Sequence, residues 1–108
     1  MIEIKLNNDN LLLEIYNFNN LNETFINNIT FLKISNTDIN IIPNIFINLK
    51  ELHLNNCNII KEIPNYCNLK KLYLYNCNNI IEIPNTLLNL QELNIQYCVN
   101  FKYLRNKK

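Results

Sequence analysis

Apolar residues recur along this chain with a period of 20 or 21 residues. The segment from Leu49 to Asn68 reads LKELHLNNCNIIKEIPNYCN, and the segment from Leu69 to Asn89 reads LKKLYLYNCNNIIEIPNTLLN. A related segment starts at Leu90, and Ile29 to Asn48 has the same apolar skeleton. A fixed period of this length predicts a solenoid in which each unit forms one coil. We number the units 1 to 4, for residues 29–48, 49–68, 69–89 and 90–108.

Each unit begins with a segment of the form L-x-x-L-x-L, in which apolar and polar residues alternate. Alternation with a period of two predicts a strand with one buried face. Stacked units would pair these strands in parallel, about 4.8 Å apart, in a sheet on the concave side of the solenoid. The residues expected to point inward are Leu32 and Ile34, Leu52 and Leu54, Leu72 and Leu74, and Leu93 and Ile95.

The second half of each unit has apolar residues spaced by three. This spacing predicts an extended or 3₁₀ return on the convex side, because 20 residues leave little room for an α-helix. Unit 1 is one residue shorter here, so we expect a local irregularity within Thr37 to Ile42. The spaced residues are Cys57, Ile60 and Ile63, then Cys77, Ile80 and Ile83, then Cys98, Phe101 and Leu104.

Proline and asparagine recur at the corners of the units. A Pro-Asn pair favours a turn, and an Asn side chain can satisfy loop backbone groups just before a strand. We interpret both positions as structural. They are Pro43, Pro64 and Pro84, each followed by Asn, and the pre-strand Asn28, Asn48, Asn68 and Asn89.

The two ends differ from the repeats. Residues 1–28 predict an N-terminal cap of the same domain, with a β-hairpin formed by Ile2–Leu6 and Leu11–Ile15 and a short helix that begins near Asn20. The C-terminal end carries no comparable cap. We therefore expect an uncovered edge strand there, and such an edge invites pairing with another subunit.

The composition narrows the range of functions. Ten basic and nine acidic residues give a net charge of +1, which does not suggest a nucleic-acid or lipid-surface binder. The first residues lack the apolar stretch of a signal peptide, and no segment is apolar for long enough to span a membrane, so we expect a cytoplasmic location. The chain has 26 Asn and no Gly or Ala. An AT-rich genome explains this bias better than an aggregation-prone Asn tract. The asparagines lie within a strict repeat of apolar residues, and low-complexity tracts lack such a repeat.

These repeats resemble the leucine-rich repeat family over Ile29 to about Leu104. The C-x-x-I-x-E-I-P wording of Cys57–Pro64 and Cys77–Pro84 is similar to the units of intracellular plant resistance proteins, and the unit length is similar to that of bacterial effector repeats. The resemblance implies an α/β-type solenoid that recognises a protein on its concave sheet and needs no cofactor. A P-loop is excluded because the chain has no Gly, so any enzymatic output would come from a partner.

The cysteines favour a structural role over a metal site. Cys57, Cys77 and Cys98 are separated by the repeat period, whereas zinc sites use short C-x₂₋₄-C steps. We expect them to be buried, reduced and metal-free. Cys67 is expected in the convex core, at the place taken by Phe46 and Leu87 in the neighbouring units.

The sequence gives little support for a catalytic site. His53 is the only histidine, and strand alternation points it outward while Cys57 points inward, which opposes a Cys-His pair. Glu62 and Glu82 fall on the convex side and do not converge as an acid-base pair. We therefore expect no enzyme activity.

The outward positions of the four strands are the candidate binding surface. Stacked in register, they form columns that carry aromatic and charged residues, and Tyr is enriched at interface hot spots. The alternative is that Tyr is here simply a good strand former, and both interpretations stay open. The candidate residues are Phe31, Lys33, Glu51, His53, Lys71, Tyr73, Tyr75, Asn94, Gln96 and Tyr97.

Overall fold

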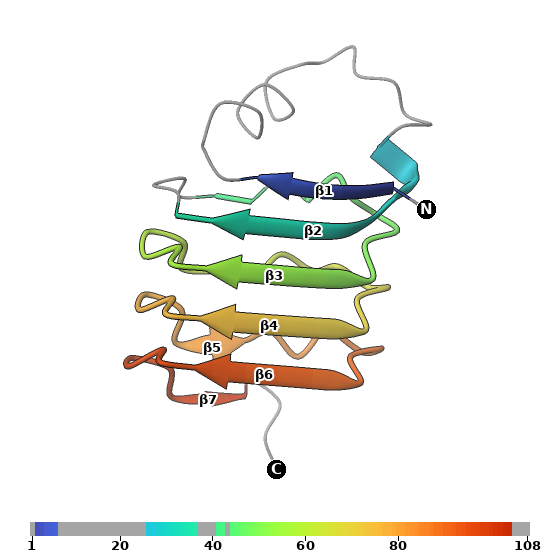
Figure 1. Cartoon of the computed structure of the whole chain (residues 1–108). Helices are drawn as coiled ribbons and strands as arrows, with labels where there is room; N and C mark the ends of the chain where they lie inside the picture. Colours follow the sequence, from blue (N-terminus) through green and yellow to red (C-terminus); the bar gives the residue numbers. More distant parts are fainter. Residues whose placement is uncertain (1, 7–25, 37–40, 43, 105–108) are drawn as a thin grey trace.

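The computed structural model describes residues 2–6, 26–36, 41–42 and 44–104. Five parallel strands form one sheet in the order β1-β2-β3-β4-β6, and two short strands form a second sheet behind it (Figure 1). The first sheet contains β1 (Ile2–Leu6), β2 (Ile29–Ser35), β3 (Glu51–Asn55), β4 (Lys71–Tyr75) and β6 (Glu92–Gln96). The second pairs β5 (Glu82–Ile83) with β7 (Tyr103–Leu104).

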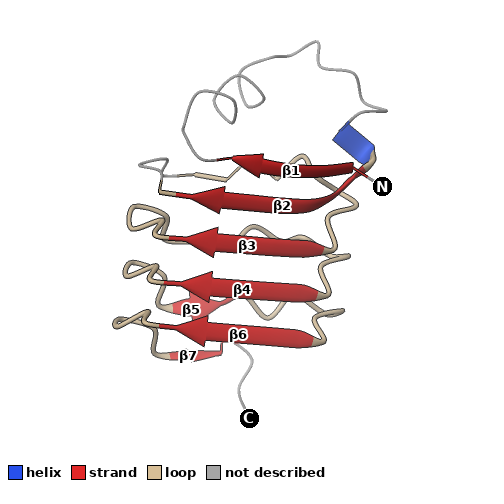
Figure 2. Cartoon of the chain, viewed as in Figure 1, coloured by secondary structure: helices blue, strands red, loops and turns tan. Residues whose placement is uncertain are grey.

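The expected solenoid with a parallel sheet on its concave side is confirmed. Adjacent strands pair without slippage from β2 to β6, so that Leu52 lies opposite Leu32 on one side and Leu72 on the other. Because side chains alternate along a strand, this register stacks the inward leucines and isoleucines of successive units into one core. In Figure 2 the return segments behind the sheet are loops with two short strands, and no helix lies there among the described residues.

The N-terminal segment differs in part from the expectation. β1 extends the sheet by pairing in parallel with β2, from Ile2 opposite Ile29 to Leu6 opposite Ile34, with one register shift near its start. The second arm of the predicted hairpin, Leu11–Ile15, lies outside the described residues, as does most of the predicted helix, of which only Ile26 and Asn27 are described as helical. The expected irregularity of unit 1 also falls mostly outside them.

The core is a single cluster of stacked apolar side chains. It contains the inward strand residues, the spaced residues of the return path and one aromatic or leucine per unit near the corner. Burying such side chains is the main favourable term in folding, at about 25 cal/mol per Å² of apolar surface. Each unit thus supplies one layer of a core that only its neighbours can complete.

The prediction for Cys67 is wrong. Its side chain is exposed, and the adjacent Tyr66, with an exposed fraction of 2%, lies in the core beside Phe46 and Leu87. Unit 2 has one residue fewer between its Pro-Asn corner and the next strand than units 1 and 3. The third residue after the proline is buried in units 1 and 3, and in unit 2 that residue is Cys67. The buried residue is instead set by its distance from the next strand, because the Leu69 N–H donates to the Tyr66 carbonyl over 3.0 Å.

Asparagine side chains connect neighbouring units. The pre-strand amides donate from Nδ2 to a backbone carbonyl 21 or 22 residues earlier: Asn48 to Asn27 at 2.8 Å, Asn68 to Ile47 at 3.0 Å and Asn89 to Cys67 at 2.8 Å. These bonds satisfy loop carbonyls that a single unit leaves unpaired. The structural interpretation of this position is therefore confirmed for these three residues.

A second set of asparagines ends the strands. The residue after β2, β3 and β4 has a positive φ, namely Asn36 at 54°, Asn56 at 56° and Asn76 at 54°. Asparagine tolerates this left-handed region better than other non-glycine residues, which suits a chain without glycine. The Asn56 Nδ2 donates to Asn36 Oδ1 over 2.8 Å, and the Asn76 Nδ2 donates to Asn56 Oδ1 over 2.6 Å. We call these three residues the strand-end ladder.

Candidate binding surface on the concave face

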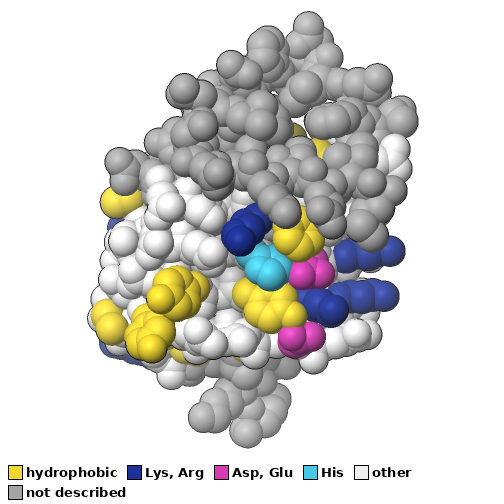
Figure 3. Space-filling model, in the orientation of Figure 1, with side chains coloured by type: hydrophobic (Ala, Val, Ile, Leu, Met, Phe, Trp, Pro, Cys, Tyr) yellow, Lys and Arg dark blue, Asp and Glu magenta, His cyan; other side chains and the backbone are white. Residues whose placement is uncertain are grey.

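The concave face is formed by the outward side chains of β2, β3, β4 and β6. The strand register aligns Phe31, Glu51, Lys71 and Glu92 in one column, and Lys33, His53, Tyr73 and Asn94 in the next. Figure 3 shows hydrophobic, basic and acidic side chains gathered on this face around a histidine side chain, drawn in cyan. Nine of the ten candidate residues thus share one face, and the tenth, Tyr97, directly follows β6. The aromatic candidates form two groups.

The first group is a stack of three aromatic rings across three strands. The Phe31 and His53 ring centroids are 5.0 Å apart with planes inclined by 35°, and the His53 and Tyr73 centroids are 4.4 Å apart at 33°. Offset contacts of this kind are favourable beyond the area that they bury. The rings are half-buried, so part of each remains available to a second molecule.

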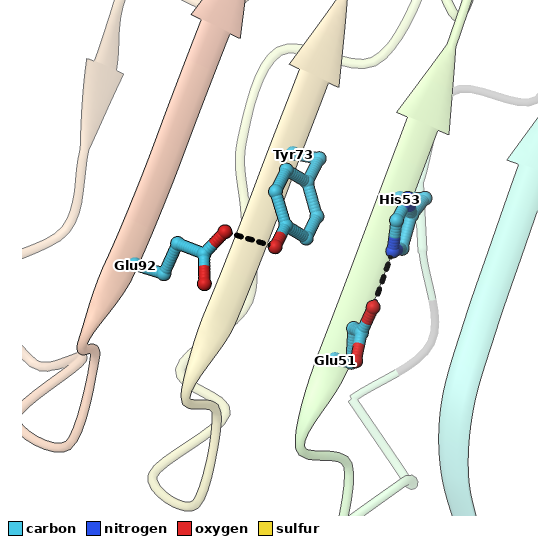
Figure 4. A network of polar contacts seen from close by, with 4 residues as sticks. All are labelled: Glu51, His53, Tyr73 and Glu92. Atoms are coloured by element: carbon cyan, nitrogen blue, oxygen red, sulfur yellow. Dashed lines mark hydrogen bonds and ion pairs between the residues drawn. The ribbon is translucent and has the colours of Figure 1, made fainter.

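Two glutamates bond to the polar atoms of His53 and Tyr73 in this stack (Figure 4). His53 Nε2 lies 2.7 Å from the Glu51 carboxylate on the same strand, and the Tyr73 hydroxyl donates to Glu92 on the neighbouring strand. The bond to the Glu92 carboxylate raises the pKa of Tyr73 to about 12, because loss of the phenolic proton would place two negative charges together. The two carboxylates fix the orientation of both rings.

The lysines of the face are not paired in this way. Lys71 lies between Glu51 and Glu92 in their column, but the only ion pair among the side chains of residues 26–36, 41–42 and 44–102 joins Glu51 to His53. Both carboxylates thus bond to rings, while Lys33 and Lys71 make no ion pair with residues 26–36, 41–42 or 44–102, whose side chains are described. The face presents two ammonium groups beside an aromatic surface.

The second group lies where β4 and β6 end. The Tyr75 and Tyr97 rings meet edge to face, with centroids 5.5 Å apart and planes at 85°. Their exposed fractions are 43% and 70%. Asn94 and Gln96, on the last strand β6, are also exposed.

Sequence reasoning placed Glu92 in its column but not among the candidate binding residues. Its contact with Tyr73 is diagonal, from one strand to the next, and column alignment alone does not reveal it. The sequence does place Glu92 and Tyr73 at diagonal positions of adjacent strands, and long side chains can bridge such positions. This placement could have predicted the contact.

The cysteines lie on the opposite side of the sheet from the aromatic residues. Cys57, Cys77 and Cys98 are buried free thiols, and the Cys77 N–H lies 3.3 Å from Cys98 Sγ. A hydrogen bond from Cys57 lowers the pKa of Cys77, while burial raises the pKa of Cys98. No described set of three His, Cys, Asp or Glu residues is grouped as a metal site would need.

A hollow of about 910 Å³ lies on the convex side of units 1 to 3. Its wall mixes apolar and charged side chains. Its lining includes Ile41, Ile59, Lys61, Glu62, Glu82 and Pro84. In the part of the chain that the structure describes, no helix is long and apolar enough to cross a membrane.

Comparison with known proteins gives the class of this fold. The Leucine Rich Repeat family model matches residues 48–67 and 68–90, which correspond to units 2 and 3. Units 2 and 3 are therefore leucine-rich repeats, and the parallel coils of the described residues are consistent with a leucine-rich repeat solenoid. Leucine-rich repeats are generally protein-interaction modules. No curated protein and no solved structure matched the chain.

Proposed function

We propose that this protein is a non-catalytic module that binds a partner protein on its concave face. The observation that carries the proposal is the Phe31–His53–Tyr73 stack, whose rings are held by Glu51 and Glu92. Aromatic side chains that are already ordered lose little conformational entropy on binding, so more of their contact energy becomes affinity. Tyrosine in such a position is a frequent hot spot.

The charges of the face favour a particular partner chemistry. Glu51 and Glu92 bond to rings of the protein itself, whereas Lys33 and Lys71 make no ion pair with the side chains of residues 26–36, 41–42 and 44–102. A segment with an apolar side chain to cover the rings and a nearby carboxylate to meet the lysines would satisfy both features. We therefore propose an acidic, partly apolar segment of a partner protein as the ligand.

The area of the face limits the affinity. Four strands with three or four outward positions each offer roughly a dozen residues, whereas a standard interface uses about 20 to 30 per side. A tight complex would need contacts from loops or from a second copy of the chain.

Affinity capture from the native cell tests this proposal. The wild-type protein and the variant His53→Ala/Tyr73→Ala serve as baits, and Lys61→Ala, an exposed change on the convex side, is the matched control. We expect a partner that the wild type and the control retain and that the concave variant loses. Equal retention by all three folded baits would rule out the concave face as the binding surface.

A second candidate function is self-association through the C-terminal edge of the sheet. The observation that favours it is the incomplete burial of unit 4, where Leu90, Leu93, Ile95 and Phe101 are only partly buried although they pack on the core. An assembly that covered this end would bury more apolar surface.

A further inference from the structure

β6 is the last strand of the larger sheet, and its outer side is unpaired among the described residues. The Glu92 N–H donates to the Lys70 carbonyl over 3.0 Å, and the Gln96 carbonyl accepts from the Asn76 N–H over 2.8 Å. Backbone groups of alternate residues point to opposite sides of a strand. The N–H and C=O groups of Leu93 and Ile95 therefore point away from β4, toward the open edge.

The side chains of the same two residues are also incompletely covered. Leu72 and Leu74 of β4 have exposed fractions of 0% and 1%, whereas their counterparts Leu93 and Ile95 in β6 are only partly buried. As far as the described residues show, the edge thus presents both unpaired backbone groups and apolar side chains, and a strand added beside β6 would satisfy both.

The sequence of β6 is self-complementary when two copies run antiparallel. A two-fold axis through Asn94 places Leu93 of one copy opposite Ile95 of the other, so the outward backbone groups of these residues meet. The same axis sets Glu92 opposite Gln96 of the second copy, and no like charges oppose each other. Both concave faces lie on one side, and both cores lie on the other.

This register uses the strand fully. It pairs all five residues of β6, from Glu92 to Gln96. Moving the axis to Ile95 would set Leu93 opposite Tyr97, whose φ of 56° ends the extended backbone. Moving it to Leu93 would leave Gln96 opposite Leu90, which precedes the strand.

We propose that two copies of this chain form a dimer through antiparallel pairing of β6 with β6, centred on Asn94. This rests on the second candidate function above and assigns its partner and register. The dimer joins the two sheets into one and covers the exposed apolar end of each unit 4.

The test is sedimentation equilibrium of the full chain over a range of concentrations, with charge variants at Gln96. Gln96→Lys places an ammonium group opposite Glu92 of the second copy twice per dimer, and Gln96→Glu places a carboxylate there. We expect the dimer Kd to fall roughly fivefold with lysine and to rise roughly fivefold with glutamate. The same two changes at Asn55, in the same column on the interior strand β3, should leave the Kd unchanged.

The outcomes separate the two levels of the proposal. A wild-type protein that stays monomeric up to about millimolar concentration, where even a dimer with a Kd of about 1 mM would be populated, overturns self-association itself. A dimer whose Kd does not respond to the Gln96 variants, or responds in the same direction to both, overturns the register centred on Asn94. Opposite shifts that occur at Gln96 and not at Asn55 support it.

Discussion

Tyr97 occupies in unit 4 the backbone position that Asn76 occupies in unit 3, and their φ values are 56° and 54°. The Asn76 side chain donates to Asn56 and continues the strand-end ladder, whereas a tyrosine has no amide with which to do so. The Tyr97 ring instead contacts the Tyr75 ring edge to face, and most of the Tyr97 side chain is exposed. A bulky residue in the left-handed region costs about 1 to 2 kcal/mol, so this position carries backbone strain at an exposed aromatic residue.

The first prediction is that Tyr97→Asn stabilises the protein. Asparagine tolerates the positive φ and can extend the ladder to Asn76, so the free energy of unfolding should rise by about 1 kcal/mol. Tyr97→Ala removes the ring and keeps the unfavourable backbone, and it should give no such gain. Urea denaturation of the three proteins measures both effects, and a stabilised alanine variant would contradict this explanation.

The second prediction separates the two contributions of Asn56, which combines a positive φ with hydrogen bonds to Asn36 and Asn76. Asn56→Gly keeps the backbone conformation and loses the side-chain bonds, so it should cost about 1 kcal/mol. Asn56→Ala loses the bonds and also meets the left-handed penalty, so it should cost about 2 kcal/mol. Thermal unfolding compares them, and equal losses would show that the backbone conformation contributes nothing.

The third prediction uses the neighbours Leu72 and Tyr73, which point to opposite sides of β4. Leu72 has an exposed fraction of 0%, so Leu72→Ala should cost about 2 to 5 kcal/mol through lost burial and a cavity. Tyr73→Ala removes a half-buried ring on the concave face and should change stability by about 1 kcal/mol or less. Chemical denaturation of both variants measures this, and a larger loss for Tyr73→Ala would contradict the assignment of the two faces.

The fourth prediction concerns thiol reactivity. Cys67 is exposed, whereas Cys57, Cys77 and Cys98 are buried. In the folded, reduced protein one thiol should therefore react rapidly with an aromatic disulfide reagent, and the other three should react after denaturation. Cys67→Ser should remove the rapid phase and leave the three slow thiols, and a rapid phase that survives this change would place a different cysteine at the surface.

Much of the fold was readable from the sequence because each unit repeats the same short pattern. Alternation identified Leu52 and Leu54 as inward residues, and the repeat fixed their neighbours in the sheet. The pattern was less informative where a unit changes length, as at Cys67 and Tyr66, since the layer follows the next strand and not the preceding proline. For β1, alternation gives the buried face of a strand but does not identify the strand beside it.

The candidate surface was readable only in outline. The columns that contain His53 and Tyr73 follow from strand register, which the repeat specifies. Their bonds to Glu51 and Glu92 depend on side-chain rotamers and on diagonal neighbours, which a linear pattern does not encode. The left-handed backbone at Asn56 and Asn76 was likewise hidden, although an asparagine recurs at that place in three units.

The strand-end ladder runs in one direction, because the Asn56 side chain donates a hydrogen bond to Asn36 in the unit before it and accepts one from Asn76 in the unit after it. An inserted copy of unit 2 would bring one donor and one acceptor to this column and would leave no amide without a partner. The array can therefore lengthen by duplication of a whole unit, with no compensating change elsewhere in the column. Asparagine at this position would let each added copy of unit 2 bond in the same way to the copy before it and the copy after it.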